Sequence, residues 1–215
     1  MKEEFYIGWQ NQAPKGYGQW VKYVVWTLVI MVPAIAALLV LNQRGFSNSV
    51  YEITHLSTLE GILLTEPIPC LKIPVGIDEG GNMQFQRIVL VGRGKKSARP
   101  ALEQLEQQKG QKLHGQGIRL KGKLVYYDGI VAFELGPEER LFQGFSKLKG
   151  TPALRPTLLG KVTLRGEILD PKCYLGVMRP GEGKPHRSCA IRCLAGGIPA
   201  FFKASTLKGW QYCFV

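Results

Sequence analysis

Residues 118–135 read IRLKGKLVYYDGIVAFEL, and this stretch predicts a β-hairpin. Charged residues occupy every second position between Ile118 and Leu124, as in a strand that buries one face, and residues 130–135 form a mostly apolar run of strand length. Asp128-Gly129 between them has the length and composition of a two-residue hairpin turn. Gly122 lies inside the first strand, where a glycine permits the sharp bend that a small closed barrel requires.

The pattern around this glycine occurs three times in the chain. An apolar residue, a charged residue and a glycine follow one another at 59–61, 120–122 and 164–166, each with an apolar residue two places later. We therefore expect bent strands in all three places. The strands expected before the hairpin are 59–65, 73–75 and 85–91.

A short helix is expected between the third and fourth strands. Ser97 can cap it, Pro100 fits its first turn, and Gly110 follows its last turn. Three strands, a helix and two strands is the element order of an OB-fold. The sequence therefore predicts a mainly β protein with an OB-fold-like five-stranded barrel over residues 45–136.

The remainder of the chain predicts a second, smaller unit. Residues 137–160 are rich in Gly and Pro and predict a linker. Residues 161–215 predict a partial OB-like β/α unit, with strands at 162–169, 198–203 and 211–215. The last of these strands ends before a five-stranded barrel is complete, so we expect the first unit, a partner or further chain to complete it.

The second unit contains four side chains of the kinds that bind metals. They are Cys173, His186, Cys189 and Cys193. On a helix, His186, Cys189 and Cys193 share one stripe, which Cys173 can approach from a neighbouring strand. Three interpretations stay open: a disulfide or ordinary core packing, a metal- or haem-related site, and a redox-active thiol. The spacing lacks the C-x-x-C knuckle typical of zinc sites, and the total of five cysteines leaves one unpaired in any disulfide scheme.

The N-terminal part predicts a membrane anchor. Residues 23–41 carry no charge and are rich in Val, Leu, Ile and Ala, which suits a bilayer-spanning helix over 20–44. Trp20, Tyr23 and Trp26 at one end and Arg44 at the other fit the two membrane interfaces. The aromatic segment 1–19 is then a cytoplasmic leader.

Charge predicts the orientation and the partners. The leader side of the span carries Lys2, Lys15 and Lys22, whereas only Arg44 follows closely on the other side. The positive-inside rule places the N-terminus in the cytoplasm and the C-terminal region in the periplasm of a bacterium. The net charge of +12 suits anionic lipid headgroups or an acidic protein. A tethered domain outside the cytoplasm argues against nucleic acid as the partner.

Three motifs carry a resemblance to a protein family. They are Asp170-x-Lys172-Cys173-Tyr174-x-Gly176, Pro180-Gly181-Glu182-Gly183-Lys184-x-His186-x-x-Cys189-Ala190-x-x-Cys193 and Gly196-Gly197-Ile198-Pro199. With the leader Glu4-Phe5-Tyr6-x-Gly8-Trp9, they resemble a group of uncharacterised bacterial membrane proteins. The resemblance implies a single span, an OB-like ectodomain and association with membrane electron-transfer proteins, but it implies no established activity.

Together these observations favour a non-catalytic accessory or scaffolding subunit of a larger bacterial inner-membrane complex, respiratory or electron-transferring. No dinucleotide, Walker or nucleophile-elbow motif occurs, and no small-molecule substrate is indicated. The first alternative is a metal- or haem-handling assembly factor that uses Cys173, His186, Cys189 and Cys193. The second is a thiol–disulfide oxidoreductase. The leading interpretation needs no cofactor, whereas the first alternative needs a metal ion at those four residues.

Overall fold

The computed structural model describes residues 14–42, 48–148, 160–206 and 209–215. The chain divides into two compact units, 1–45 and 46–215, which are described separately. The first contains one helix, α1 (Lys15–Leu41), which continues through Pro33 and buries none of its residues within the protein. Its apolar window has a mean hydropathy of 2.7, and the helix is long enough to serve as a membrane anchor or a signal sequence.

Helix α1 begins earlier than the sequence indicated. Residues 15–19, which were expected in the leader, form its first turns. The aromatic side chains of Trp20, Tyr23 and Trp26 are exposed along the same helix. Arg44 and most of the leader lie outside the described residues.

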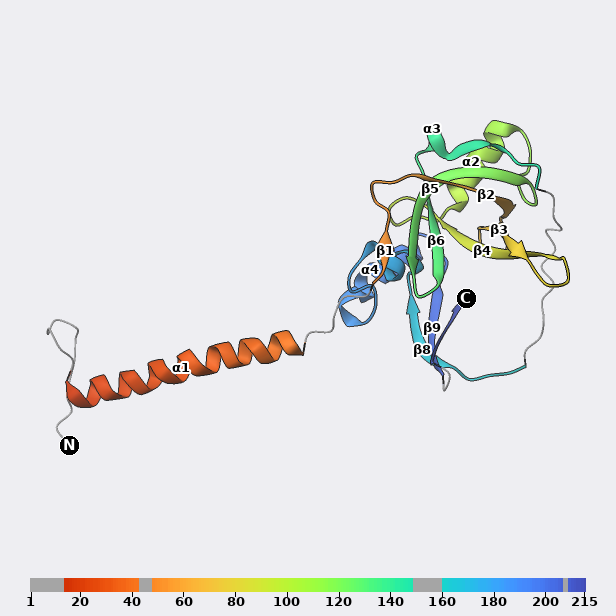
Figure 1. Ribbon diagram of the computed structural model, residues 1–215. Helices are drawn as coiled ribbons and strands as arrows, with labels where there is room; N and C mark the ends of the chain where they lie inside the picture. Colours follow the sequence, from red (N-terminus) through yellow and green to blue (C-terminus); the bar gives the residue numbers. More distant parts are fainter. Residues whose placement is uncertain (1–13, 43–47, 149–159, 207–208) are drawn as a thin grey trace. The chain divides into compact units, whose positions relative to one another are not determined.

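The second unit is built on a closed five-stranded barrel (Figure 1). Its strands are β2 (Ser57–Leu64), β3 (Cys70–Ile77), β4 (Met83–Val91), β5 (Gly117–Tyr127) and β6 (Ile130–Leu135). They follow the order β5-β2-β3-β4-β6, and β6 pairs back with β5 to close the barrel. Neighbouring strands are antiparallel except β4 and β6, which run parallel. Helix α2 (Arg99–Lys109) connects β4 to β5.

The predicted hairpin 118–135 is confirmed. Tyr127 pairs with Ile130, and both Asp128 and Gly129 have positive φ angles, as a tight hairpin turn requires. Gly122 makes a close approach to the next strand, because a Cβ atom there would lie 2.2 Å from the carbonyl oxygen of Glu134. The barrel can close at this point only with a glycine.

Helix α2 seals the barrel interior. Leu102 and Leu105 on its inner face pack with Leu90, Ile118 and Phe133 from three strands. The helix begins two residues after Ser97, whose Oγ accepts the N–H of Arg99 at 3.2 Å. Gly110 ends it in the left-handed conformation.

The predicted linker needs correction over its first part. Residues 138–141 form α3 (Glu138–Leu141), and β7 (Phe142–Phe145) pairs with β5. Leu141 is buried in the barrel core. A further short strand, β1 (Val50–Tyr51), also pairs with β5. These segments extend the barrel sheet, and residues 149–159 lie outside the described part of the chain.

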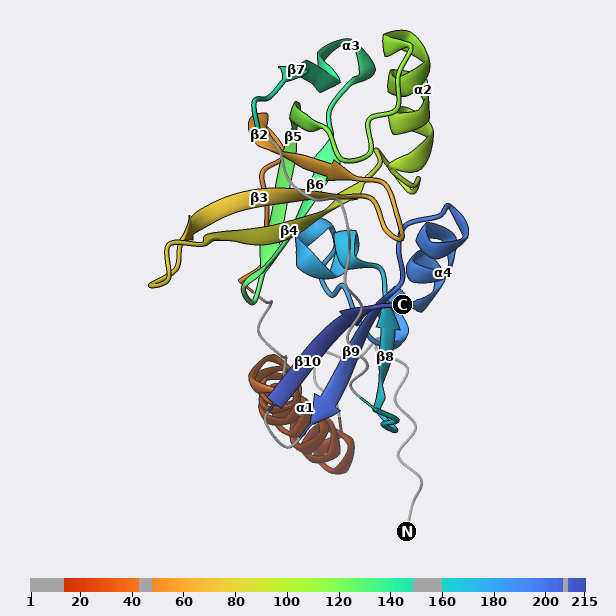
Figure 2. The same cartoon turned by 90° about the vertical axis from the view of Figure 1, so that its right-hand side faces the viewer.

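The C-terminal part differs from the expected partial barrel. The strands β8 (Arg165–Leu169), β9 (Phe201–Thr206) and β10 (Gly209–Phe214) form a separate antiparallel sheet in the order β8-β9-β10 (Figure 2). Three helical segments lie between β8 and β9, namely η1 (Cys173–Val177), η2 (Lys184–His186) and α4 (Arg187–Ala195). Leu169, Leu175 and Phe201 pack on Val125 and Ala132 of the barrel. The two predicted units therefore share a core.

Candidate metal centre

The four predicted Cys and His residues come together between η1 and α4. Cys173 starts η1, three residues after the buried Asp170 that follows β8. His186 ends η2, and the helix that continues from it carries Cys189 and Cys193. Cys173 thus approaches from a helical segment and not from a strand, which corrects one detail of the prediction.

The side chains form two overlapping groups. The Sγ atoms of Cys173 and Cys189 and a ring nitrogen of His186 all lie within 4.8 Å of one another. The Sγ atoms of Cys173 and Cys193 and a carboxylate oxygen of Asp170 also lie within 4.8 Å of one another. Cys173 belongs to both groups. Such distances bring the donors into the range that a shared metal ion requires.

His186 is the unusual member of this cluster. Its side chain is 2% exposed, and neither ring nitrogen has a hydrogen-bond partner among the described residues. Oδ2 of Asp170 is buried and unpartnered in the same way. A buried polar group without a partner costs about 1–3 kcal/mol, and nearly all such groups in native proteins are satisfied. A metal ion bound through one ring nitrogen would satisfy that nitrogen of His186.

Burial keeps the thiols of Cys173 and Cys193 and the imidazole of His186 uncharged when no ion is bound. Burial, followed by the nearby Asp170 carboxylate, raises the pKa of the Cys173 thiol far above its usual range. Burial, followed by a hydrogen bond to Asp170, raises the pKa of Cys193 to about 12. Burial lowers the pKa of His186, so its imidazole is neutral and has a free lone pair. Metal binding would have to displace the thiol protons.

Two of the cysteines lack the features of a reactive thiol. A reactive cysteine has a lowered pKa and an accessible sulfur, whereas Cys173 and Cys193 are buried with raised pKa values. All five cysteines are free, so the disulfide expected between Cys173 and a cysteine of the helix is not observed. Among the interpretations based on sequence, the metal site fits this geometry best.

A buried lysine fixes the centre to the barrel. Lys172 is 3% exposed, and its Nζ lies 2.5 Å from Oε2 of Glu134 on β6. The same ammonium donates to the carbonyl oxygens of Gly92 at 2.9 Å and Gly94 at 2.8 Å. The backbone N–H of Lys172 donates to Oδ1 of Asp170 at 2.9 Å. The segment that carries Cys173 is thus held to both β6 and the loop after β4.

The other side of the centre also packs on the barrel. Cys193 and Ile198 contact Val89 and Val91 of β4. At the end of α4, the carbonyl oxygen of Gly196 accepts the N–H of Ser97 at 2.9 Å. The centre therefore lies where the C-terminal segment, which runs from β8 to β10, joins the barrel.

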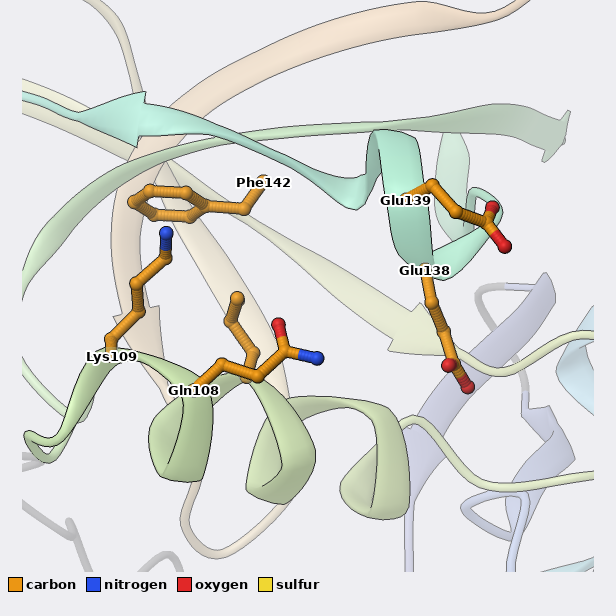
Figure 3. Close-up of a pocket in the computed structure, with 6 residues that line it drawn as sticks. Gln108, Lys109, Glu138, Glu139 and Phe142 are labelled. Carbon is orange, nitrogen blue, oxygen red and sulfur yellow. The ribbon is translucent and has the colours of Figure 1, made fainter.

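The surface pockets lie elsewhere. One has a volume of about 290 Å³ and lies between α2 and the α3–β7 segment, where Nζ of Lys109 is 4.5 Å from the centre of the Phe142 ring (Figure 3). Another, of about 450 Å³, is lined by residues that include Arg99, Glu106 and His114. Neither pocket includes a residue of the metal cluster.

Sequence reasoning found Cys173, His186, Cys189 and Cys193 but missed Asp170. Its position three residues before Cys173 could have identified Asp170, because this spacing places both residues on one face of a helical turn. No known protein family matches the sequence, and no curated protein or solved structure is significantly similar to it.

Proposed function

We propose that the protein is a membrane-anchored, non-catalytic scaffold whose extramembrane unit is held together by a divalent metal ion. Cys173, His186 and Cys189 would bind the ion. The observation that carries the proposal is the buried imidazole of His186, which has no hydrogen-bond partner and lies within 4.8 Å of two thiol sulfurs. Such a group is costly unless something binds it.

The donor set favours zinc or a similar ion. Thiolates and imidazole are the usual ligands of structural zinc sites, which have four ligands, and this group supplies three of them. Cys173 and His186 are buried, which suits a closed site. When bound, the ion would supply positive charge that stabilises the thiolates and joins η1 to α4.

A structural ion would serve the docking of the C-terminal segment. Cys173 and Cys193 pack against β4, and Lys172 is anchored to β6. An ion that holds η1 and α4 together would keep both in place against the barrel. The proposed ion therefore stabilises the extramembrane unit and the surface that this unit presents, and it takes part in no catalytic step.

The sheet β8-β9-β10 supports a role in assembly. Its register places Ile168, Phe202 and Cys213 side by side on one face. Ile168 is 55% exposed and Cys213 is exposed, and Leu164 just before β8 is exposed as well. This apolar face favours contact with other subunits of a membrane complex, and a respiratory or electron-transferring complex is our proposal from the sequence resemblance.

A second candidate is a metal-handling assembly factor. Cys189 is partly exposed, unlike the other two donors of its group, and could give an ion a route in and out. The two candidate functions predict different rates of metal exchange. A structural ion exchanges slowly with a chelator, whereas cargo exchanges rapidly.

The barrel and the anchor carry two further proposals. We propose that the barrel is an OB-fold, because its five strands close with β4 parallel to β6 and a helix lies between β4 and β5. We also propose that α1 is an uncleaved anchor in the bacterial inner membrane, with the N-terminus in the cytoplasm and residues 46–215 in the periplasm. The lysines before and within its first turns support this orientation.

The test of the metal proposal is the metal content of the full-length protein purified in detergent. We expect zinc to co-purify, and the His186→Ala and Cys189→Ser variants should each contain at least one zinc ion fewer per chain than the wild type. His114→Ala and Cys213→Ser change an exposed histidine and an exposed cysteine, and they should retain the wild-type content. Wild-type protein that binds no metal after growth and loading with zinc would refute the proposal.

A further inference from the structure

We infer that the second group of donors, Asp170, Cys173 and Cys193, holds a second divalent ion, bridged to the first through the Cys173 thiolate. The inference rests on the proposed function, because the first ion is the one bound by Cys173, His186 and Cys189. It adds a dinuclear centre, with Asp170 as a ligand.

The geometry of the second group is as tight as that of the first. All its donor atoms lie within 4.8 Å of one another, and all three residues are buried. Asp170 and Cys173 are one helical turn apart, and Cys193 faces them from α4. Cys193 groups with Asp170, and not with His186 and Cys189, among the described residues. A single ion bound by all four Cys and His residues would require them to move closer together.

A second observation that supports the inference is the burial of the Asp170 carboxylate. Its Oδ1 accepts the backbone N–H of Lys172 at 2.9 Å. Its Oδ2 is buried and has no hydrogen-bond partner among the described residues. Asp170 is 0% exposed, and its carboxylate interacts with the thiols of Cys173 and Cys193, the other two members of the group. Carboxylate oxygen is an accepted zinc ligand alongside thiolate, so a second ion would satisfy it.

Charge balance is consistent with two ions. With both groups of donors occupied, three thiolates and the Asp170 carboxylate carry four negative charges, which two divalent ions neutralise. The buried cation next to Cys173 in sequence, Lys172, is already paired with Glu134. Uncompensated charge in a buried site is costly. A second divalent ion makes the cluster neutral, and the thiolate sulfur of Cys173 has lone pairs enough to bind both ions.

The test is zinc stoichiometry on the full-length protein in detergent, loaded with Zn²⁺ and measured against protein determined by amino-acid analysis. We expect two zinc ions per chain in the wild type and in the Cys213→Ser control. Asp170→Asn and Cys193→Ser should each retain one, because they leave the first group intact. His186→Ala should also retain no more than one.

A second measurement needs no variant. Two Co²⁺ ions that share a thiolate couple magnetically, so the electron paramagnetic resonance signal of the first equivalent should weaken when the second is added. One zinc ion per chain, unchanged in Asp170→Asn, would overturn the second site and leave the proposed function standing. No zinc at all would overturn both. A cobalt signal that saturates at one equivalent would also overturn the bridged pair.

Discussion

Replacing Glu134 with glutamine should destabilise the extramembrane unit strongly. Glu134 is 7% exposed, and its carboxylate neutralises the ammonium of Lys172 at 2.5 Å. Glutamine keeps the size of the side chain and removes the charge. Lys172 would then be a buried cation with only two carbonyl oxygens, those of Gly92 and Gly94, as strong partners.

The expected loss is about 3 kcal/mol in the free energy of unfolding. Breaking one side of a buried ion pair typically costs about 3–5 kcal/mol, and the two remaining hydrogen bonds place this case at the lower end. A domain of this size loses roughly 2–4 °C in melting temperature per kcal/mol, so the shift should be about 6–12 °C. The double variant Glu134→Gln/Lys172→Met removes both charges. It should be more stable than the sum of the two single losses predicts, by about 1–3 kcal/mol.

The assay is urea unfolding of the full-length protein in detergent, followed by circular dichroism of its β structure. Glu66→Gln is the matched control, because Glu66 forms an ion pair with Arg99 in which both side chains are largely exposed. This control should unfold close to the wild type. If Glu134→Gln unfolds like the control, or if the double variant shows the simple sum of the single losses, the buried pair does not anchor the C-terminal segment.

Three further predictions concern other parts of the chain. Gly196→Ala should destabilise by about 1–3 kcal/mol, because the added Cβ would lie 1.8 Å from the carbonyl oxygen of Lys95, whereas Gly76→Ala, with open space around it, should be close to neutral; thermal unfolding of both tests this. Burial and the neighbouring glutamate raise the pKa of Tyr51 to about 12. The neutral phenol thus contributes stability that is complete below pH 10 and is lost as the pH rises towards 12, so Tyr51→Phe should lose less stability than the wild type between pH 9 and pH 12; parallel slopes would show that the phenol does not contribute. A membrane-impermeant maleimide should label the exposed Cys213 in intact spheroplasts, and Cys213→Ser, which keeps the partly exposed Cys189, should be labelled less; labelling only after lysis would place this region in the cytoplasm.

The barrel could be predicted because its sequence is locally consistent. The hairpin 118–135 has an alternating segment before, and a mostly apolar segment after, a turn that only a few dipeptides form, and the structure confirms it. Ser97 and Pro100 indicate the start of helix α2, and Gly110 indicates its end. The apolar run of α1 needs only composition to be recognised.

The chain after the hairpin was harder to predict because tertiary contacts determine it. Helix α3 and strand β7 are too short for a periodic pattern, and β7 pairs with β5, which is distant in sequence. From the sequence alone a lysine at position 172 is expected to be exposed, whereas the structure pairs it with Glu134. The cysteine and histidine types identified the centre, but only the fold shows that Asp170 belongs to it.

Zinc K-edge X-ray absorption of the purified full-length protein tests the central claim most directly. If Cys173, His186 and Cys189 bind the ion, the first shell should contain sulfur at about 2.3 Å and nitrogen at about 2.0–2.1 Å, with the outer scattering of an imidazole ring. His186→Ala should lose the imidazole signal. A first shell of oxygen or nitrogen alone, or a spectrum that His186→Ala leaves unchanged, would contradict the account.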